Sequence, residues 1–291
     1  MSKIRKAVIT DAGFASRYLP ITKTIPKAML PVGNRPIMQF VVEECVTAGI
    51  EEIIIVATPE GKPIYEDYFN NSVNRIRKQL ASQGKEDRYE PVQHILDFPK
   101  IVVIEQDPSL PYGNGSPIVS ARNFLADEEA FLALYSDDVV FDSSDAKTLV
   151  DSYAKHPGAK AIIMAQEMDE TVLNKYGVIS LKDKEKHTLS HIVEKPKNNA
   201  PSNLTSYGRY LLTREVFDYL DPKNIGLDGE LWTVDAITKM AVDGDVYVEK
   251  TAGQWMTTGD PANYFIAHLK FVLDEESYAA EVVEYFKQLI K

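Results

Sequence analysis

Short apolar runs alternate with longer amphipathic segments along the first half of the chain. Five runs of strand length are dominated by Val, Ile, Leu, Ala and Phe, at residues 7–9, 52–57, 100–106, 130–135 and 159–166. Continuous runs of this kind are typical of strands buried on both faces of a parallel sheet. Between the first two runs, residues 37–48 carry apolar positions at helical spacing and end at Gly49, which predicts a helix. The order strand, loop, helix, strand predicts a doubly wound, Rossmann-like α/β fold whose ligands lie at the carboxyl ends of the strands.

The second half of the chain predicts an accessory β and helical region that makes the sheet a mixed one. We expect a helix to begin at 118–124, a hairpin formed by 176–181 and 189–193, strands at 203–212 and 246–249, and helices at 214–219, 233–242 and over the last thirty residues.

Residues 61–98 differ from the rest, because they are polar with apolar positions at helical spacing. They predict two helices joined at 82–85, on a surface insertion without chemistry of its own. We expect residues 1–291 to form a single domain, with 61–98 as a helical insertion and 260–291 as C-terminal helices.

Composition restricts the class of protein. The chain has 291 residues, of which 44% are apolar and 26% charged, and this fits one large α/β domain with a packed core. The net charge of −11 argues against nucleic acid or an anionic membrane as a main partner, but not against a nucleotide at a local site. The single cysteine, Cys45, lies in an apolar pattern, which predicts a core residue and excludes an internal disulfide. The sequence shows no signal-peptide pattern and no membrane-spanning run, so we expect a cytoplasmic location.

The loop after the first apolar run carries candidate phosphate-binding chemistry. Small residues at 10–16 are followed by three cations, Arg17, Lys23 and Lys27, in a stretch punctuated by prolines. Backbone N–H groups of such a loop can face phosphate oxygens while Arg and Lys neutralise charge. A solvated loop between a strand and a helix is the alternative, because one glycine, Gly13, is a weak signal.

Two carboxylates, Asp137 and Asp138, follow the run at 130–135. Carboxylates at the end of a buried strand are costly unless something compensates their charge. A hard cation such as Mg²⁺ with a triphosphate is one compensation. A helix N-cap or a turn is the alternative origin of such a pair.

The segment 6–39 resembles the nucleotide-binding loop of the bacterial UTP–glucose-1-phosphate uridylyltransferases, also called UDP-glucose pyrophosphorylases. The family pattern is roughly A-A-G-x-G-T-R-x-L-P-x-T-K-x-x-P-K-x-M-L-P. The residues that fit this pattern are Gly13, Arg17, Leu19, Pro20, Thr22, Lys23, Pro26, Lys27, Met29, Leu30 and Pro31. The resemblance continues over nearly the whole chain, and it implies the mixed α/β sheet of nucleotide-diphospho-sugar transferases.

The resemblance also implies roles for individual residues. Those implied to be catalytic are Arg17, Lys27 and Lys195. Those implied to bind the nucleotide are Ala12, Gly13, Gln106, Gly113, Gly115 and Asp137, with Gln106 on the uracil edge and the glycines close to the base. Those implied to bind the sugar phosphate are Tyr176, Gly177, Glu194, Lys195, Gly208 and Glu230. Asp137 is the implied metal ligand, with Mg²⁺ as the cofactor.

Several positions depart from the family pattern. Asp11 replaces the first alanine, and a carboxylate there would repel a triphosphate unless a metal, a ribose hydroxyl or a neighbouring cation pairs with it. Ala15 replaces the second glycine, which costs roughly 1 kcal/mol if this position needs a positive φ. Thr257 replaces the aspartate that completes the family's metal site, and Ser116 and Pro117 replace a His-Ala pair.

Three functional hypotheses follow from the resemblance and its departures. The first is a Mg²⁺-dependent enzyme that makes UDP-glucose and pyrophosphate from UTP and glucose 1-phosphate. The second is a nucleotidylyltransferase for another nucleotide or sugar, and the third is a non-catalytic binding or regulatory paralogue. A Rossmann-type oxidoreductase is disfavoured, because no G-x-G-x-x-G follows the first run. The resemblance further implies a homodimer or homotetramer.

Overall fold

Parallel strands from the N-terminal half form one side of a nine-stranded sheet in the computed structural model, which describes residues 3–223, 225–274 and 276–289. Strand β1 (Lys6–Asp11) lies parallel to β4 (Glu52–Ala57) and to β6 (Ala130–Tyr135), and β4 lies parallel to β5 (Lys100–Glu105). Four of the five predicted runs are therefore strands of this side, with nearly the predicted bounds. Their carboxyl ends share one edge of the sheet, which is where we expected ligands.

The second side of the sheet is mixed. Its strands are β11 (Leu204–Thr213), β8 (Ala161–Glu167), β12 (Val246–Lys250), β10 (Thr188–Glu194) and β9 (Gly177–Asp183). The full order is β5-β4-β1-β6-β11-β8-β12-β10-β9. Strand β11 runs antiparallel to both β6 and β8, and all ten of its residues are buried. This central strand joins the two sides, so the predicted mixed sheet with a β-hairpin region is confirmed.

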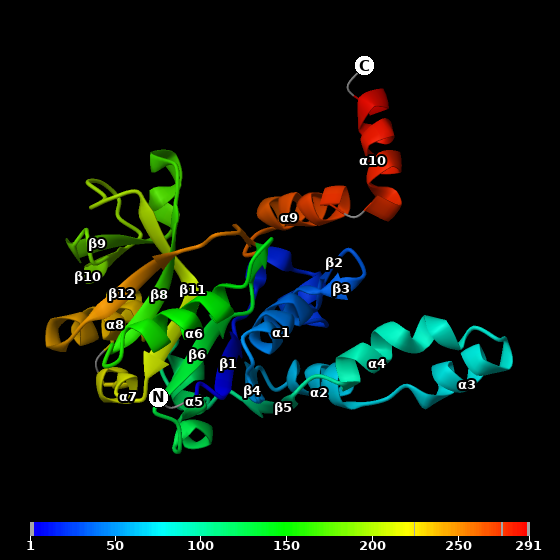
Figure 1. The fold of residues 1–291 in the computed structure, drawn as a ribbon, viewed down its shortest axis with the longest axis horizontal. Helices are drawn as coiled ribbons and strands as arrows, with labels where there is room; N and C mark the ends of the chain where they lie inside the picture. The colour runs from blue at the N-terminus through cyan, green and yellow to red at the C-terminus, as the bar shows by residue number, and fades with distance from the viewer. Residues whose placement is uncertain (1–2, 224, 275, 290–291) are drawn as a thin grey trace.

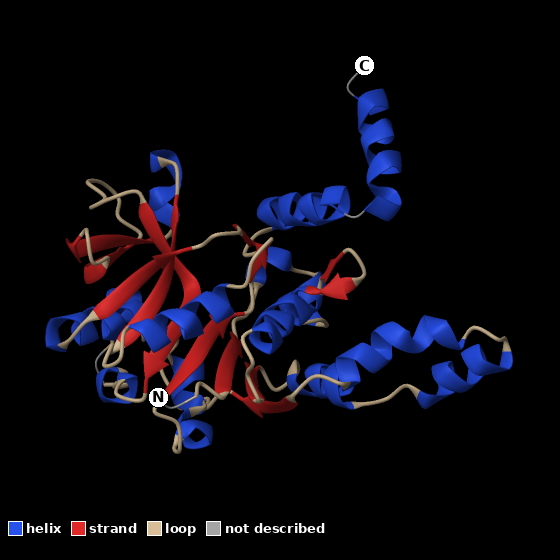
Figure 2. Ribbon diagram, viewed as in Figure 1, coloured by secondary structure: helices blue, strands red, loops and turns tan. Residues whose placement is uncertain are grey.

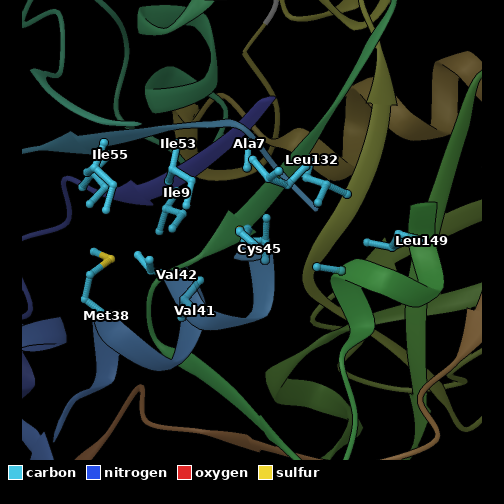
Figure 3. Close-up of a cluster of buried hydrophobic side chains, with 14 of the residues drawn as sticks. Ala7, Ile9, Met38, Val41, Val42, Cys45, Ile53, Ile55, Leu132 and Leu149 are labelled. Carbon is cyan, nitrogen blue, oxygen red and sulfur yellow. The ribbon is translucent and has the colours of Figure 1, made fainter. Parts of the chain in front are cut away.

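Helices cover both faces of the sheet (Figures 1 and 2). On one face, α1 (Ile37–Thr47) and α6 (Asp145–Lys155) pack against alternate side chains of β1, β4 and β6. Cys45 is fully buried in this layer, as predicted (Figure 3). On the other face, α5 (Ser116–Ser120), α7 (Val216–Tyr219) and α8 (Thr233–Asp243) cover the remaining side chains. Successive side chains of each strand thus point to opposite faces and enter two separate apolar layers, which confirms the doubly wound fold.

Three parts of the fold differ from the sequence-based expectation. The insertion holds three α-helices where we predicted two, namely α2 (Lys62–Asn70), α3 (Asn74–Ser82) and α4 (Glu90–Leu96). Helix α6 was not predicted, although Ser144 is its N-cap and accepts a bond from the Lys147 N–H group at 3.1 Å. A small sheet formed by β7 (Asp138–Phe141) and β13 (Gln254–Thr257) was also missed, because four-residue strands carry little periodicity.

Short elements complete the chain. Strands β2 (Pro31–Val32) and β3 (Arg35–Pro36) form a two-stranded ribbon before α1. Helices α9 (Pro261–Asp274) and α10 (Glu276–Leu289) follow β13, and α10 extends away from the sheet in Figure 1. Within the described ranges, no helix has both the length and the apolar character needed to span a membrane.

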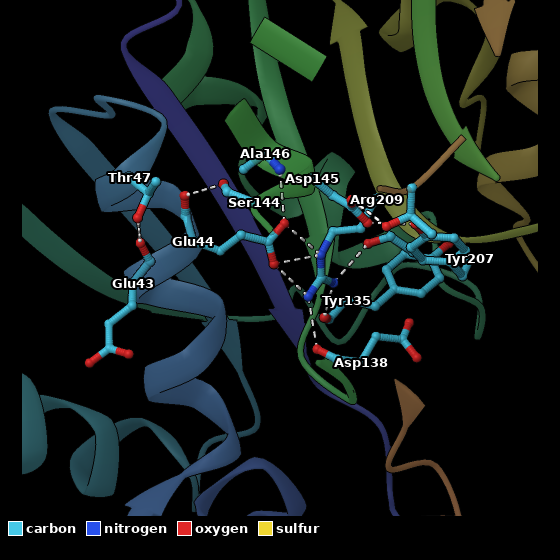
Figure 4. Close-up of polar contacts among 12 residues, drawn as sticks. Glu43, Glu44, Thr47, Tyr135, Asp138, Ser144, Asp145, Ala146, Tyr207 and Arg209 are labelled. Carbon is cyan, nitrogen blue, oxygen red and sulfur yellow. Dashed lines mark hydrogen bonds and ion pairs between the residues drawn. The ribbon is translucent and has the colours of Figure 1, made fainter. Parts of the chain in front are cut away.

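A buried ion pair joins α1 to the centre of the sheet. Arg209 on β11 is fully buried, and its Nε donates to both carboxylate oxygens of Glu44 at 3.0 and 3.2 Å (Figure 4). The other guanidinium nitrogens donate to the carbonyl oxygens of Tyr135 and Asp138 at 2.9 and 2.8 Å. The Glu44 carboxylate also accepts the Ala146 N–H at 2.9 Å, in the first turn of α6. One guanidinium thus ties two helices to the turn between β6 and β7.

We predict that Glu44→Gln lowers the free energy of unfolding by about 3 kcal/mol, because it leaves the buried Arg209 cation without its counter-charge. Urea denaturation of the purified protein measures this loss. The control is Asp151→Asn, which removes an exposed i,i+4 pair with Lys147 and costs at most about 0.5 kcal/mol. Equal stability of both variants would contradict a structural role for the buried pair.

Candidate active site at the carboxyl ends of the strands

A cavity of about 290 Å³ opens at the carboxyl ends of β1 and β6. It is lined by the loop after β1, the loop after β5, the end of β6 and the segment before α8. The lining residues are Thr10, Asp11, Ala12, Gly13, Ala15, Lys27, Gln106, Tyr112, Gly113, Asn114, Pro117, Tyr135, Ser136, Asp137, Glu230 and Trp232. Seven of the predicted site residues are among them: Ala12, Gly13, Lys27, Gln106, Gly113, Asp137 and Glu230. The structure therefore brings together residues that lie more than 200 positions apart in the sequence.

The charged centre of the cavity is an ion pair between Lys27 and Asp137. The Lys27 ammonium donates to Asp137 Oδ2 at 2.6 Å, with side chains that are 13% and 32% exposed. Burial alone would lower the pKa of Lys27, but the carboxylate of Asp137 outweighs it and raises that pKa. The same contact holds the pKa of Asp137 below its usual range against the effect of burial. Both groups are therefore charged at neutral pH, and Lys27 remains a cation at the cavity wall.

The negative charge of Asp11 is compensated by hydrogen bonds from two hydroxyl groups. Its Oδ1 accepts from Ser136 at 2.6 Å, and its Oδ2 accepts from Tyr65 of helix α2. Burial raises the pKa of Asp11 to about 6, although the hydroxyl bonds and the nearby Lys27 oppose this. At neutral pH most of this carboxylate is ionised, and its charge is compensated by the two hydroxyl groups and by the nearby Lys27. Neither hydroxyl partner was predicted, because Tyr65 lies in the insertion to which we assigned no chemistry.

The loop after β1 has a left-handed backbone at Ala15, with φ 46° and ψ 40°. The positive φ on which the expected cost of alanine depends is therefore present. Arg17 follows in an exposed turn, where its Nη1 donates to the Gly259 carbonyl oxygen at 3.2 Å. A Cβ placed on Gly259 would lie 3.4 Å from Asp137 Oδ2, so Arg17 reaches the outer side of the same charged cluster. Arg17 itself lies beyond the cavity lining.

The two glycines of the loop after β5 meet a further constraint besides the approach to the base that we predicted. Gly113 has φ 134°, and a Cβ there would lie 2.4 Å from the Leu231 carbonyl oxygen. A Cβ on Gly115 would lie 3.0 Å from the same atom, which accepts the Gly115 N–H at 2.9 Å. The close approach in the structure is therefore to the Leu231 backbone. This packing holds Glu230 and Trp232, on either side of Leu231, at the cavity.

Two of the residues predicted to hold the sugar phosphate, Lys195 and Glu194, lie next to each other, and Lys195 packs on Trp232. The Lys195 ammonium lies 4.7 Å from the centre of the Trp232 ring and 3.6 Å from Glu194 Oε1. Lys195 itself has a positive φ of 46°, a strained backbone of the kind found at binding sites. Burial raises the pKa of Glu194, and the nearby Glu230 adds to this rise. These three ionisable groups thus form one cluster around the indole.

Glycines bring the neighbouring strands close to this cluster. A Cβ on Gly177, at the start of β9 next to Tyr176, would lie 3.0 Å from Glu194 Oε2. A Cβ on Gly208 would lie 2.0 Å from the ring of Tyr135, which lines the cavity. Gly208 therefore acts through Tyr135, and neither glycine lies in the cavity wall itself.

The carboxylates near Asp137 differ in their availability to a metal. Thr257 pairs with Asp138 in the small sheet, and its hydroxyl lies on the same side of Gly259 as Asp137 Oδ2. Asp138 is buried, and burial next to Asp137 raises its pKa to about 7. Asp260 accepts N–H groups from Ala262 and Asn263, in the first turn of α9. Asp138 is thus buried and Asp260 is engaged in the first turn of α9, whereas Asp137 lines the cavity.

Among the described residues, no group of three or more His, Cys, Asp or Glu side chains could hold a metal. Mg²⁺ often uses only one or two protein carboxylates and takes its other ligands from substrate phosphates and water. Asp137, partly exposed at the cavity and next to the Thr257 hydroxyl, fits a metal bound in that way.

Comparison with known proteins agrees with this architecture. The family model described as nucleotidyl transferase matches residues 6–273. This chain belongs to the nucleotidyl transferase family. A UTP–glucose-1-phosphate uridylyltransferase 2 of Staphylococcus saprophyticus is 38% identical over 293 aligned residues, which cover 99% of each chain. Among solved structures, a UTP-bound UGPase from Acinetobacter baumannii has a TM-score of 0.84 at 30% identity, over 99% of this chain and 98% of that one. A UDP-glucose pyrophosphorylase complexed with UDP-glucose has a TM-score of 0.80 at 29% identity, over 94% and 100%.

Several residues of the cavity wall were not predicted from the sequence. These are Thr10, Tyr112, Asn114, Tyr135, Ser136 and Trp232. Tyr112, Asn114 and Ser136 adjoin predicted site residues in the sequence, which was the available signal for these three. Trp232 had one further signal, because it is one of only two tryptophans and follows the acidic stretch 228–230.

We predict that Ala15→Gly raises the free energy of unfolding by about 1 kcal/mol, because glycine adopts the observed left-handed conformation without strain. The control is Ala81→Gly in exposed helix α3, which lowers it by about 1 kcal/mol. Chemical denaturation measures both. A loss of stability in Ala15→Gly would contradict the strain that we assign to this position.

Proposed function

We propose that this protein transfers the uridylyl group of UTP to glucose 1-phosphate and so makes UDP-glucose and pyrophosphate. The observation that carries the proposal is one cavity lined by a phosphate-type cation, Lys27, and by Glu230 and Trp232, with Lys195 packed on the Trp232 ring and paired with Glu194. Full-length similarity to enzymes with this activity supports the same substrates.

The proposed reaction needs charge stabilisation more than it needs a base. A phosphate oxygen of glucose 1-phosphate attacks the α-phosphorus of UTP, and the bridging oxygen leaves with the pyrophosphate. The attacking oxygen is already anionic, so no covalent enzyme intermediate is required. Two polyanions must instead be held in line while charge on the leaving group is stabilised. We assign Lys27 and Arg17 to the triphosphate and Lys195 to the sugar phosphate.

The remaining predicted residues receive binding roles under this proposal. Gln106 and the backbone of Gly113 face the base side of the cavity, while Ala12 and Gly13 present the backbone of the first loop. Acidic groups suit the hydroxyls of a hexose, and we assign Glu194 and Glu230 to glucose. We propose Mg²⁺ as the cofactor: when bound, it would be held by Asp137 and would supply positive charge to the triphosphate.

The direct test is pyrophosphate release from glucose 1-phosphate and Mg²⁺ with UTP, dTTP, CTP, ATP and GTP in parallel assays. We expect turnover with UTP. Turnover with a different nucleotide alone would overturn the assignment of UTP, and silence with every nucleotide and with other sugar 1-phosphates would leave the binding or regulatory paralogue as the better account.

Two lysine variants from one segment test the site assignment within the same assay. Lys195→Met should lower kcat/KM for glucose 1-phosphate by at least about a hundredfold, because it removes a charge-assisted contact made to phosphate. The matched control is Lys197→Met, two residues away, on a lysine that lines a different cavity. Normal turnover by Lys195→Met would show that the sugar phosphate binds elsewhere.

Thr257→Asp tests the proposed metal position. The new carboxylate would adjoin Asp137, so we expect the Mg²⁺ concentration for half-maximal rate to fall several-fold, roughly as a second carboxylate ligand strengthens Mg²⁺ binding. Thr257→Asn, similar in size and neutral, is the control. An unchanged Mg²⁺ requirement in Thr257→Asp would place the metal away from Asp137.

We further propose that the chain acts as one nucleotidylyltransferase domain in a homodimer or homotetramer in the cytoplasm, where UTP is available. Helices α9 and α10 expose apolar side chains that would be costly in water, namely Phe265, Ile266, Leu273, Val283, Tyr285, Phe286 and Leu289. Sedimentation velocity should give a species of two or four times the chain mass of 32.7 kDa. A single species of the chain mass at micromolar concentration would contradict self-association.

A further inference from the structure

Two large aromatic side chains are exposed to solvent at the mouth of the candidate site. Phe14 is 76% exposed and Tyr112 is 56% exposed, although neither lies on an outer helix. Their ring centres are 6.0 Å apart and their planes differ by 11°, so they stack on each other. Phe14 belongs to the loop after β1 and Tyr112 to the glycine-bearing loop after β5. The stack therefore bridges two loops that both contribute to the cavity.

The two rings have different positions relative to the cavity. Tyr112 is part of its lining. Phe14 lines a neighbouring space of about 330 Å³, together with Lys23 and the Thr58–Gly61 turn. Phe14 therefore lies beside the Tyr112 ring from a position outside the cavity lining. The inner face of Tyr112 is the one that a molecule in the cavity would meet.

The backbone fixes Tyr112 but leaves its ring exposed. The Tyr112 carbonyl oxygen accepts the Leu231 N–H at 2.8 Å, and Gly113 packs against the Leu231 backbone. Phe14 is the more exposed of the two rings, at 76% against 56%. Tyr112 is thus an anchored platform, and Phe14 supports it through ring contact.

Three aromatic residues line the cavity, and Tyr112 is the exposed one, since Tyr135 and Trp232 are only partly exposed. The wall holds the charged side chains of Asp11, Lys27, Asp137 and Glu230, which suit phosphates and hydroxyls. A pyrimidine ring needs a flat apolar surface, and stacking of a base on an aromatic side chain is a general solution. Gln106 lies in the same wall and offers an amide to the edge of such a ring.

We propose that Tyr112 stacks on the nucleobase and that Phe14 is a positioning residue that backs the Tyr112 ring. The bound order is base, Tyr112, Phe14. The inference rests on the proposed function, since it takes UTP as the nucleotide. Stacking depends on the π-face and not on base identity, so the pair contributes affinity while the groups around Gln106 distinguish the bases.

The test is the dissociation constant of UTP, measured by calorimetry on the purified protein with Mg²⁺. Tyr112→Ala should weaken UTP binding at least about fivefold, and Tyr112→Phe should restore it, because the stacking face remains. Inorganic tripolyphosphate, which carries no base, should bind Tyr112→Ala as it binds the unmodified protein. Phe14→Ala should weaken UTP binding about threefold, and this loss should disappear in the Tyr112→Ala background.

Phe124→Ala is the matched control, because Phe124 is an exposed phenylalanine at the opposite end of β1, where its carbonyl oxygen accepts from Lys6. It should bind UTP normally. Unchanged UTP affinity in Tyr112→Ala, or an equal loss of tripolyphosphate affinity, would overturn the stacking proposal while leaving uridylyl transfer intact. Failure of the unmodified protein to bind UTP would overturn both proposals together.

Discussion

The buried guanidinium of Arg209 is the interaction on which both the fold and the site depend. It sits on the central antiparallel strand β11, where parallel and mixed sides of the sheet meet. Its partners are the Glu44 carboxylate of α1 and carbonyl oxygens at either end of the turn between β6 and β7. A cation that is fully buried is tolerated only when its donors are satisfied, so the surrounding backbone has little freedom to move. Asp137 lies inside the turn that is held in this way.

The position of Asp137 connects this core to the chemistry. Thr258 fixes the same turn from the other side, because its N–H and hydroxyl both donate to the Asp137 carbonyl oxygen, at 2.7 and 2.8 Å. With its backbone held on two sides, Asp137 presents its carboxylate to Lys27. The charged pair at the cavity is therefore set by buried contacts that lie outside the cavity. A fixed charge of this kind costs little reorganisation when a polyanion binds.

The principal strands could be predicted from the sequence, because a continuous apolar run indicates a strand buried on both faces whatever packs against it. Strand β7 and its partner β13 could not be predicted, since they are four residues long and meet across more than 100 positions. The left-handed Ala15 was predictable because the family pattern has glycine at that position. The packing of Gly113 against Leu231 was not predictable, because this contact is formed only in the folded chain.

The candidate site was predictable where a residue type carries its own chemistry. Lys27, Asp137, Gln106 and Glu230 were identified from the sequence, and the structure places all four in one cavity wall. The compensation of Asp11 by Tyr65 was hidden, because it depends on how the helical insertion packs beside the first loop. Lys195 and Arg17 are not part of the cavity wall. The sequence alone does not predict the contacts of their long side chains with Trp232 and with the Gly259 carbonyl oxygen.

The central claim is that one cavity holds the nucleotide on the side of Lys27 and the sugar on the side of Lys195. A crystal structure of the protein with UDP-glucose tests this claim most directly. The account predicts the diphosphate between Lys27 and Lys195, the uracil beside Gln106 and the glucose against Glu194 and Glu230. UDP-glucose bound elsewhere, or bound in the reverse direction, would contradict it.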